Sequence, residues 1–283
     1  MRGALVFGKT GQVATELARI APEAHFADRH EADLTDPDGC ATLIRARNPS
    51  VVINAAAYTA VDQAEKDAQA AQRINADAPA AMARACAAIG VPFLHISTDY
   101  VFDGSGDHPR AEAAETAPIG VYGRTKRDGE SEVVAAGGQY AILRTSWVFS
   151  PHGRNFVTTM RRLGAERDRL SIVSDQIGGP TPASSIARAL IRMAEAMCAD
   201  ASKAGIYHFA GAPDTSWAGF AQEIFAQSGM DVEVTEIATA DYPTPARRPL
   251  NSRLHCAAIS HDFDIPRPDW RAALRDVISE LDA

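Results

Sequence analysis

Apolar runs alternate with helical stretches along the first half of the chain. Apolar segments predict strands at 4–7, 25–28, 51–57, 93–98 and 141–149. Asp36 and then Pro37 predict the N-cap and first residue of a helix that leads to Asn48, and another helical stretch covers about 75–89. Near-continuous apolar strands separated by helices predict a parallel sheet covered on both faces.

A glycine turn joins the first strand to the first helix in ALVFGKTGQVATELARI, which starts at Ala4. Glycine permits a tight turn and a close approach of backbone to a pyrophosphate, and the helix N-terminus attracts the anion. Ala14 stands where a third glycine is usual, which is a mild departure. The fold class is therefore predicted to be α/β, a Rossmann-type doubly wound parallel sheet. The candidate cofactor-binding residues of this turn are Gly8, Thr10, Gly11, Gln12 and Val13.

The regular alternation of apolar strands and helices ends beyond Phe149. Residues 1–150 are expected to form a dinucleotide-binding domain, and 170–210 to return to it, with 170–172 and 206–209 as strands of the main sheet. Residues 151–169 and 211–283 are expected to form a smaller C-terminal substrate-binding lobe. Ligands of such sheets bind at the carboxyl ends of the strands. Gly8, the 55–57 segment, Thr98 and Trp147 follow strand ends, so we expect them to meet in one crevice.

Tyr122 and Lys126 lie four residues apart in VYGRTKRDGE, a spacing that puts both side chains on one face of a helix. A free phenol titrates near pH ~10. A neighbouring ammonium lowers that pKa and makes tyrosine a usable acid near neutral pH. The same spacing also occurs in ordinary surface helices, so the pair needs the support of the surrounding motifs.

Composition favours a cytoplasmic enzyme. The chain has 283 residues, of which 46% are hydrophobic, and it carries a net charge of −8, which disfavours nonspecific nucleic-acid binding. No segment approaches the ~18 unbroken apolar residues of a membrane helix, and the first strand leaves no room for a signal peptide. The four cysteines are far apart and suggest neither a zinc site nor a disulfide framework.

Six motifs together resemble one enzyme family: GKTGQVA, NAAAYTAVDQAE, STDYVFDG, YGRTK, RTSWVF and YPTPARRPLNSRL. From about 3 to 254 the chain resembles the dTDP-4-dehydrorhamnose reductase family of extended short-chain dehydrogenases/reductases. The resemblance implies reduction of the C4 ketone of dTDP-4-dehydro-L-rhamnose to dTDP-L-rhamnose by NADH or NADPH. It also implies a homodimer and a magnesium ion, although Glu16 alone does not establish a metal site.

The resemblance assigns the catalytic roles to Thr98, Tyr122 and Lys126. Hydride attack on the ketone carbon puts negative charge on the oxygen, and Tyr122 would protonate it. Lys126 would tune Tyr122 and hold the nicotinamide ribose, and the Thr98 hydroxyl would bond the same oxygen. Asn75 has two open interpretations: it supports the lysine through water, or its amide satisfies backbone groups.

Asp28 lies at the end of the second strand, where an acid commonly accepts the adenosine ribose hydroxyls. This favours NAD, whereas Arg29 could pair with the 2′-phosphate of NADP. By resemblance, Asp33 and Leu34 contact the adenine, and the loop after the third strand lies beneath the pyrophosphate and ribose. That loop contributes Ala56, Ala57, Tyr58 and Thr59.

The substrate is expected to be a dTDP-linked 4-ketosugar, held at both ends. Trp147 offers a flat apolar wall for the sugar ring, and the 247–253 loop offers arginines to the diphosphate. The substrate-binding candidates are Thr98, Asp99, Tyr100, Trp147, Asn155 and Arg248.

Three alternatives remain open. A nucleotide-sugar 4,6-dehydratase needs an Asp-Glu pair after the threonine, but Tyr100 follows Asp99, so an acid is missing. An epimerase shares the motifs, and catalytic consumption of NADH would distinguish a reductase from it. A noncatalytic dinucleotide-binding protein, like the regulatory subunit of methionine adenosyltransferase, is disfavoured because Thr98, Tyr122 and Lys126 are all present.

Overall fold

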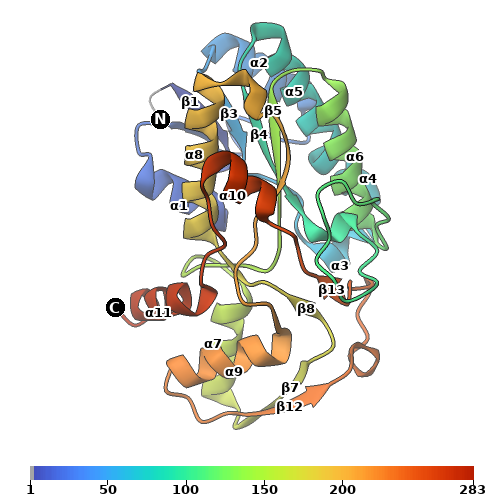
Figure 1. Ribbon diagram of the computed structural model, residues 1–283, viewed down its shortest axis with the longest axis vertical. Helices are drawn as coiled ribbons and strands as arrows, with labels where there is room; N and C mark the ends of the chain where they lie inside the picture. The colour runs from blue at the N-terminus through green and yellow to red at the C-terminus, as the bar shows by residue number, and fades with distance from the viewer. Residues whose placement is uncertain (1–2) are drawn as a thin grey trace.

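The computed structural model describes residues 3–283 and contains a central sheet of six parallel strands in the order β10-β5-β4-β3-β1-β2 (Figure 1). This confirms the predicted α/β doubly wound class. The order reverses between β1 and β3, which is where such sheets bind ligands. The strands are β1 (Ala4–Phe7), β2 (His25–Ala27), β3 (Val51–Asn54), β4 (Phe93–Thr98), β5 (Tyr140–Thr145) and β10 (Gly205–His208).

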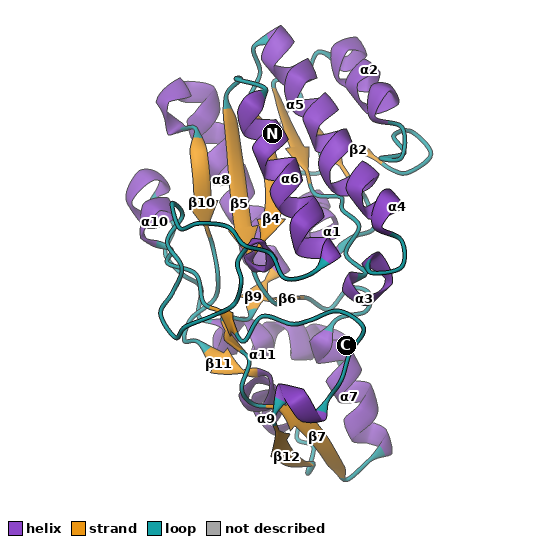
Figure 2. Cartoon of the chain, turned by 90° about the vertical axis from the view of Figure 1, so that its right-hand side faces the viewer, coloured by secondary structure: helices purple, strands orange, loops and turns teal. Residues whose placement is uncertain are grey.

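Helices cover both faces of this sheet (Figure 2). One face packs against α1 (Gln12–Ile20) and α8 (Ala183–Ala199), with α10 (Ala257–Phe263) beside β10. The other face packs against α2 (Pro37–Arg47), α5 (Ala78–Ile89) and α6 (Val121–Ala135). Both faces of the sheet are therefore buried, which is why its strands read as continuous apolar runs. Between β3 and α5 lie α3 (Val61–Ala64), α4 (Ala68–Gln72) and a π-helical turn (Arg73–Asp77).

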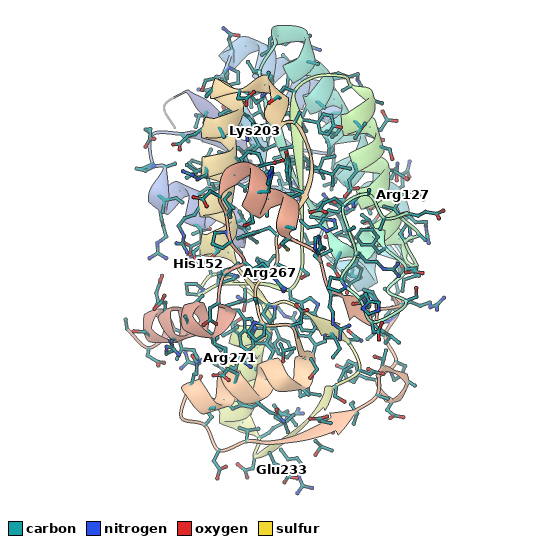
Figure 3. All side chains as sticks on the ribbon, in the orientation of Figure 1. Arg127, His152, Lys203, Glu233, Arg267 and Arg271 are labelled. Carbon is teal, nitrogen blue, oxygen red and sulfur yellow. The ribbon has the colours of Figure 1, made fainter. Side chains whose placement is uncertain are left out.

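A third hydrophobic core, built around Phe149, Phe220 and Trp270, lies below the sheet in Figure 1. It packs α7 (Phe156–Glu166), α9 (Trp217–Gln227) and α11 (Trp270–Leu281) with the parallel pair β7 (Arg169–Val173) and β12 (Glu233–Ile237). Figure 3 shows Glu233 at the far end of this part and Arg267 near its junction with the sheet. The junction contains the short strands β6 (Val148–Phe149), β8 (Ile177–Gly178), β9 (Thr181–Pro182), β11 (Thr215–Ser216) and β13 (Asn251–Ser252).

Most of the predicted elements are confirmed, and three differ. The predicted strand 51–57 ends at Asn54, whose side-chain oxygen accepts a hydrogen bond from the Ala56 N–H and turns the chain. The predicted strand 141–149 breaks before Trp147, which has a φ of 49°. The expectation that 170–172 joins the main sheet is wrong, because β7 pairs with β12, whereas β10 does join it. The alternation of exposed and buried residues along β7 suits a sheet with one solvated face.

No helix within residues 3–283 combines the length and apolarity needed to cross a membrane. The division into a dinucleotide-binding domain and a substrate-binding lobe stays a prediction.

Candidate active site

The turn between β1 and α1 has the geometry of an anion site. Gly8 has a φ of 105°, a conformation that side chains disfavour, and a Cβ at Gly11 would meet nothing within 4 Å. Gly11 is the N-cap of α1, and no side chain caps this helix. Its first-turn N–H groups therefore lack a side-chain acceptor, and they suit a pyrophosphate.

The side chains of Gln12 and Val13 at the start of α1 contact other parts of the protein. Gln12 accepts a hydrogen bond from the Ser150 hydroxyl at 2.8 Å and donates to the Val148 carbonyl at 3.4 Å. Val13 is buried in the core, and Thr10 lies exposed in the turn. Gln12 and Val13 would thus meet a cofactor through their backbone N–H groups.

Carboxylates and exposed cations alternate after β2. One Asp28 oxygen accepts from the His30 and Glu31 N–H groups, and the other lies 3.7 Å from Lys9 Nζ. These backbone hydrogen bonds hold the pKa of Asp28 below its usual range. Arg29 pairs with Asp33 at 3.2 Å, and Leu34 is buried. An acid and two cations thus lie close together at the carboxyl end of β2.

Asn75 holds the loop that follows β3. Its side-chain oxygen accepts from the Tyr58 N–H at 2.8 Å, and its amide donates to the Tyr58 carbonyl and to Thr125 Oγ1, both at 3.1 Å. This matches the interpretation in which the Asn75 amide satisfies backbone groups. It shapes the segment that carries Ala56, Ala57, Tyr58 and Thr59.

Two glycines let helix α6 pack closely on the turn after β4 and on the π-helical turn before α5. A Cβ on Gly123 would lie 2.1 Å from the Tyr100 carbonyl oxygen, and a Cβ on Gly129 would lie 2.1 Å from the Asn75 carbonyl oxygen. Any side chain at either position would push the helix away. The closeness of α6 to the end of β4 therefore depends on Gly123, and its closeness to the π-helical turn depends on Gly129.

The structure brings the Thr98 and Tyr122 hydroxyls together at the carboxyl end of β4. Thr98 ends the strand and caps the following turn by accepting from the Tyr100 N–H at 3.2 Å. The Tyr122 hydroxyl forms a hydrogen bond with Thr98, and the rings of Tyr100 and Tyr122 pack edge to face at 5.5 Å. These two hydroxyls could hold a single carbonyl oxygen between them.

The expectation that Lys126 lowers the pKa of Tyr122 is not met in this structure. Burial raises the pKa of Tyr122, and the charge of Asp99 raises it further. Lys126 is 1% exposed, and its Nζ lies 2.8 Å from the Ile96 carbonyl oxygen and 3.0 Å from His95 Nε2. Burial lowers the pKa of Lys126 to about 8. At neutral pH Lys126 therefore stays mostly charged, but its charge is not among the influences that set the pKa of Tyr122.

Asp99 adds a buried carboxyl group next to the two hydroxyls. Thr98 Oγ1 donates to it at 3.0 Å, and it is 3% exposed. Burial raises the pKa of Asp99 to about 6, against hydrogen bonds with Ser252 and Thr98 that lower it. Groups with such shifted pKa values cluster at functional sites.

Sequence reasoning missed two residues of this cluster, Asn54 and His95. They are cross-strand neighbours on β3 and β4, and Asn54 Nδ2 lies 3.2 Å from His95 Nδ1. Burial and the Lys126 charge hold the pKa of His95 well below its usual value. The sequence signal that could have identified Asn54 and His95 is the presence of polar residues inside otherwise apolar strands.

Trp147 stacks on a second indole that the sequence did not single out. The ring centroids of Trp147 and Trp217 lie 3.7 Å apart with an interplanar angle of 13°, and Trp217 donates to Gln176. One face of Trp147 is therefore covered by Trp217, at the start of α9. The sugar-binding role of Trp147 stays a prediction.

The other two substrate candidates have partners within the protein. Asn155 is the N-cap of α7: its oxygen accepts from Val157 and Thr158, and its amide donates to the Ser150 carbonyl at 2.8 Å. Arg248 Nη2 pairs with Asp62 at 2.7 Å, while its Nη1 is buried without a hydrogen-bond partner among residues 3–283. Arg248 thus keeps a free donor, whereas the hydrogen bonds of Asn155 explain its presence without a ligand.

The magnesium ion implied by resemblance finds no support. The Glu16 carboxylate lies 2.8 Å from His152 Nε2 and 3.3 Å from Arg19 Nη1, so it already has partners within the protein. Within residues 3–283, no three His, Cys, Asp or Glu side chains are grouped as metal ligands.

Comparisons with known families, sequences and structures all indicate the same group of proteins. The family model described as the RmlD substrate binding domain matches residues 1–283. A dTDP-4-dehydrorhamnose reductase of Sinorhizobium fredii is 43% identical over 98% of this chain and 96% of its own length.

Two crystal structures extend the comparison to the fold. That of a dTDP-4-dehydrorhamnose reductase from Clostridium acetobutylicum has a TM-score of 0.92 and 34% identity, and covers 100% of both chains. One from Bacillus anthracis, in complex with NADP, has a TM-score of 0.92 and 33% identity, over 99% of this chain and 100% of that one. The chain described here therefore belongs to the RmlD substrate binding domain family.

Proposed function

We propose that this protein is an NAD(P)H-dependent oxidoreductase that reduces the C4 ketone of dTDP-4-dehydro-L-rhamnose to dTDP-L-rhamnose. The observation that carries the proposal is the meeting of the Thr98 and Tyr122 hydroxyls at the carboxyl end of β4, with Lys126 buried one turn further along α6. The near full-length similarity to dTDP-4-dehydrorhamnose reductases supports the choice of substrate.

The chain's own residues would supply the acid. A bound nicotinamide supplies hydride to the ketone carbon. Tyr122 donates its proton to the ketone oxygen, and the Thr98 hydroxyl, which donates to Asp99 in this structure, would turn to donate a hydrogen bond to the same atom. The raised pKa of Tyr122 keeps the phenol protonated at neutral pH, so it enters the reaction with a proton to give. The roles of the three residues rest on this placement.

The uncapped start of α1 would hold the pyrophosphate, and the groups after β2 would select the cofactor. The acid Asp28 favours NADH, whereas Lys9 and Arg29 can attract a 2′-phosphate. The Bacillus anthracis structure was solved with NADP. We therefore infer that both cofactors bind, with Asp28 supporting NADH.

Arg248 is the best candidate for the nucleotide end of the substrate, because its Nη1 is a buried donor without a partner among residues 3–283. Burial raises the pKa of Tyr100, and Arg248 lies close enough for its charge to oppose that rise, so these residues link the two ends of the site. A homodimer stays a prediction from resemblance.

The test is a turnover assay with freshly generated dTDP-4-dehydro-L-rhamnose and either NADH or NADPH. We expect loss of nicotinamide absorbance together with formation of dTDP-L-rhamnose in equal amounts. Epimerisation of the ketosugar without consumption of the reduced cofactor would contradict the proposal. Tyr122→Phe serves as the matched control, because it removes one hydroxyl and little volume.

A further inference from the structure

Helix α3 carries two carboxylates that reach segments far away in the sequence. In Figure 1 this short helix lies below α4 and α6. Asp62 belongs to it, and Glu65 follows as its C-cap. Asp62 contacts the segment 246–248, and Glu65 contacts the start of α6. The helix therefore touches both the arginine-rich loop and the helix that carries Tyr122.

Glu65 takes the place of a side-chain N-cap for α6. The N-cap residue Gly120 has no side chain, and Glu65 Oε1 accepts from the Val121 N–H at 2.8 Å. A Cβ on Gly120 would lie 2.9 Å from the same Glu65 oxygen, so the glycine makes room for the carboxylate. A carboxylate at a helix N-terminus also interacts favourably with the helix dipole. Tyr122 follows in this first turn, so Glu65 holds the end of the helix that presents it.

Apolar contacts bring α3 against the same turn of α6. Ala64 is fully buried in a small cluster with Ala71 of α4 and Val121, and the rings of Tyr58 and Tyr122 pack against this cluster. Neighbouring residues of one short helix thus supply a carboxylate and a methyl group to α6. The position of the Tyr122 ring therefore depends on α3 as well as on β4.

Asp62 makes the corresponding contacts with the loop. Its Oδ1 accepts from the Ala246 N–H at 3.1 Å, and its Oδ2 accepts from Arg248 Nη2 at 2.7 Å. The Asp62 side chain is 44% exposed, so the ion pair adds little to stability. Its effect is geometric, because it occupies Nη2 and leaves Nη1 buried without a partner among residues 3–283. Nη1 is then the donor that an anionic ligand can take.

We propose that α3 connects the two ends of the substrate site, with Asp62 and Glu65 as positioning residues. Asp62 orients Arg248 toward the diphosphate of the nucleotide, and Glu65 holds the first turn of α6 so that Tyr122 stays beside Thr98. The carboxylates lie three residues apart, so one helical turn sets the distance between the two contacts. Binding energy gained at the diphosphate can then orient the ketone. This inference rests on the proposed function and deepens it.

Asp62→Asn tests the nucleotide end. The amide keeps the shape of the side chain but offers one oxygen to two donors, so either Arg248 or the Ala246 N–H loses its partner. We expect the Kd of dTDP, measured by calorimetry on the full-length protein, to rise at least about 10-fold. The KM for the ketosugar nucleotide should rise with it while kcat stays close to that of the wild type.

An unchanged Kd for dTDP in Asp62→Asn would overturn the role of Asp62. Tighter binding of dTDP would overturn it as well, because it would show that the Asp62 charge only competes with the ligand for the arginine.

Glu65→Ala tests the chemical end. We expect kcat to fall by about 10- to 100-fold, because a small displacement of a reacting group has an effect of this size. The KM for the ketosugar nucleotide and the affinity for the reduced cofactor should stay close to those of the wild type. Glu65→Gln keeps an oxygen for the Val121 N–H and should recover most of the kcat.

Asp269→Ala is the matched control for the loss of a cap. Asp269 caps α11, away from the site, by accepting from the Arg271 N–H at 2.9 Å. We expect this variant to have a lower melting temperature and an unchanged kcat. A wild-type kcat in Glu65→Ala, or a loss of stability alone as in the control, would overturn the positioning role of Glu65.

Gly120→Ser in the Glu65→Ala background separates positioning from stability. Removal of the carboxylate opens space for the serine, whose hydroxyl can cap α6 from the N-cap position. We expect the melting temperature to recover and kcat to stay low, because α6 is then capped but no longer held by α3. Recovery of both would overturn the proposal. If Glu65→Ala alone does not fold, this double variant gives the kcat comparison.

The wild type in the same assays distinguishes this inference from the proposed function. A wild type that neither binds dTDP nor reduces the ketosugar nucleotide contradicts the proposed function. A wild type that does both contradicts only the inference if Asp62→Asn and Glu65→Ala fail to show the expected split between KM and kcat.

Discussion

Two buried polar clusters lie between α6 and the sheet, one helical turn apart. They differ in how completely their polar atoms are hydrogen-bonded. Glu130 makes a bidentate pair with Arg144, which also donates to the Glu112 carbonyl, and His208 has partners at both nitrogens. At the end of β4, by contrast, the hydroxyls of Ser97 and of Thr145, the cross-strand partner of Thr98, are buried without hydrogen-bond partners among residues 3–283.

The contrast separates a structural cluster from a functional one. A fully paired buried cluster specifies packing and has no group left for a ligand. Shifted pKa values at Asp99 and Lys126, together with unpaired donors, are typical of a site that is completed by what it binds. Burial alone does not distinguish the two, since Lys126 and Glu130 are 1% and 3% exposed.

The largest expected effect on stability comes from breaking the structural cluster. Glu130→Ala leaves the Arg144 guanidinium buried without its carboxylate, and we expect the free energy of unfolding to fall by about 3–5 kcal/mol. Chemical denaturation measures it. A loss below about 1 kcal/mol, typical of a surface ion pair, would contradict the structural assignment.

Asp99→Asn tests the functional cluster through pH. The folded pKa of Asp99 is raised to about 6, so its ionisation destabilises the fold as pH rises from the unfolded value through that pKa. Relative to the Asn variant, we expect the wild type to lose about 3 kcal/mol of unfolding free energy between about pH 4 and pH 7. Parallel stability curves for the two proteins would show that Asp99 titrates normally.

Asp28→Asn has a smaller expected effect, on cofactor choice. Removing the carboxylate removes a ribose acceptor and frees Lys9, which lies 3.7 Å away. We expect kcat/KM to shift toward NADPH by about 10-fold, a difference of ~1.4 kcal/mol. An unchanged NADH-to-NADPH ratio would show that Asp28 does not reach the ribose.

Asn155→Ala has the smallest expected effect. Its hydrogen bonds cap α7, and the loss of an N-cap costs about 1 kcal/mol of unfolding free energy. We expect the melting temperature to fall while the KM for the sugar nucleotide stays close to that of the wild type. A large rise in KM without destabilisation would restore Asn155 as a substrate ligand.

The positions of the main strands could be predicted from the sequence because buried parallel strands are continuous apolar runs. Residue spacing likewise placed Tyr122 and Lys126 on one face of a helix, whereas only the resemblance to a family joined Thr98 to them. The sequence could not show that β7 pairs with β12, because short strands carry no information about their partners. Nor could it show the Asn54–His95–Lys126 contacts, which depend on cross-strand register and on how closely Gly123 and Gly129 let α6 approach.

Asn155 and Trp217 illustrate two further limits of the sequence. An asparagine before a helix fits both a cap and a ligand, and only its observed hydrogen bonds distinguish the two. Trp217 comes from a distant segment and meets Trp147 only in the folded protein. Contacts of this kind depend on the tertiary structure.

The most direct test of the central claim measures turnover and melting temperature for Tyr122→Phe beside Glu130→Gln. We expect Tyr122→Phe to lose ~10²- to 10⁴-fold in kcat, the usual worth of a general acid, with cofactor affinity and melting temperature close to those of the wild type. Glu130→Gln should lose stability and keep most of its kcat below its melting temperature. A Tyr122→Phe variant that retains most of its kcat would contradict the account.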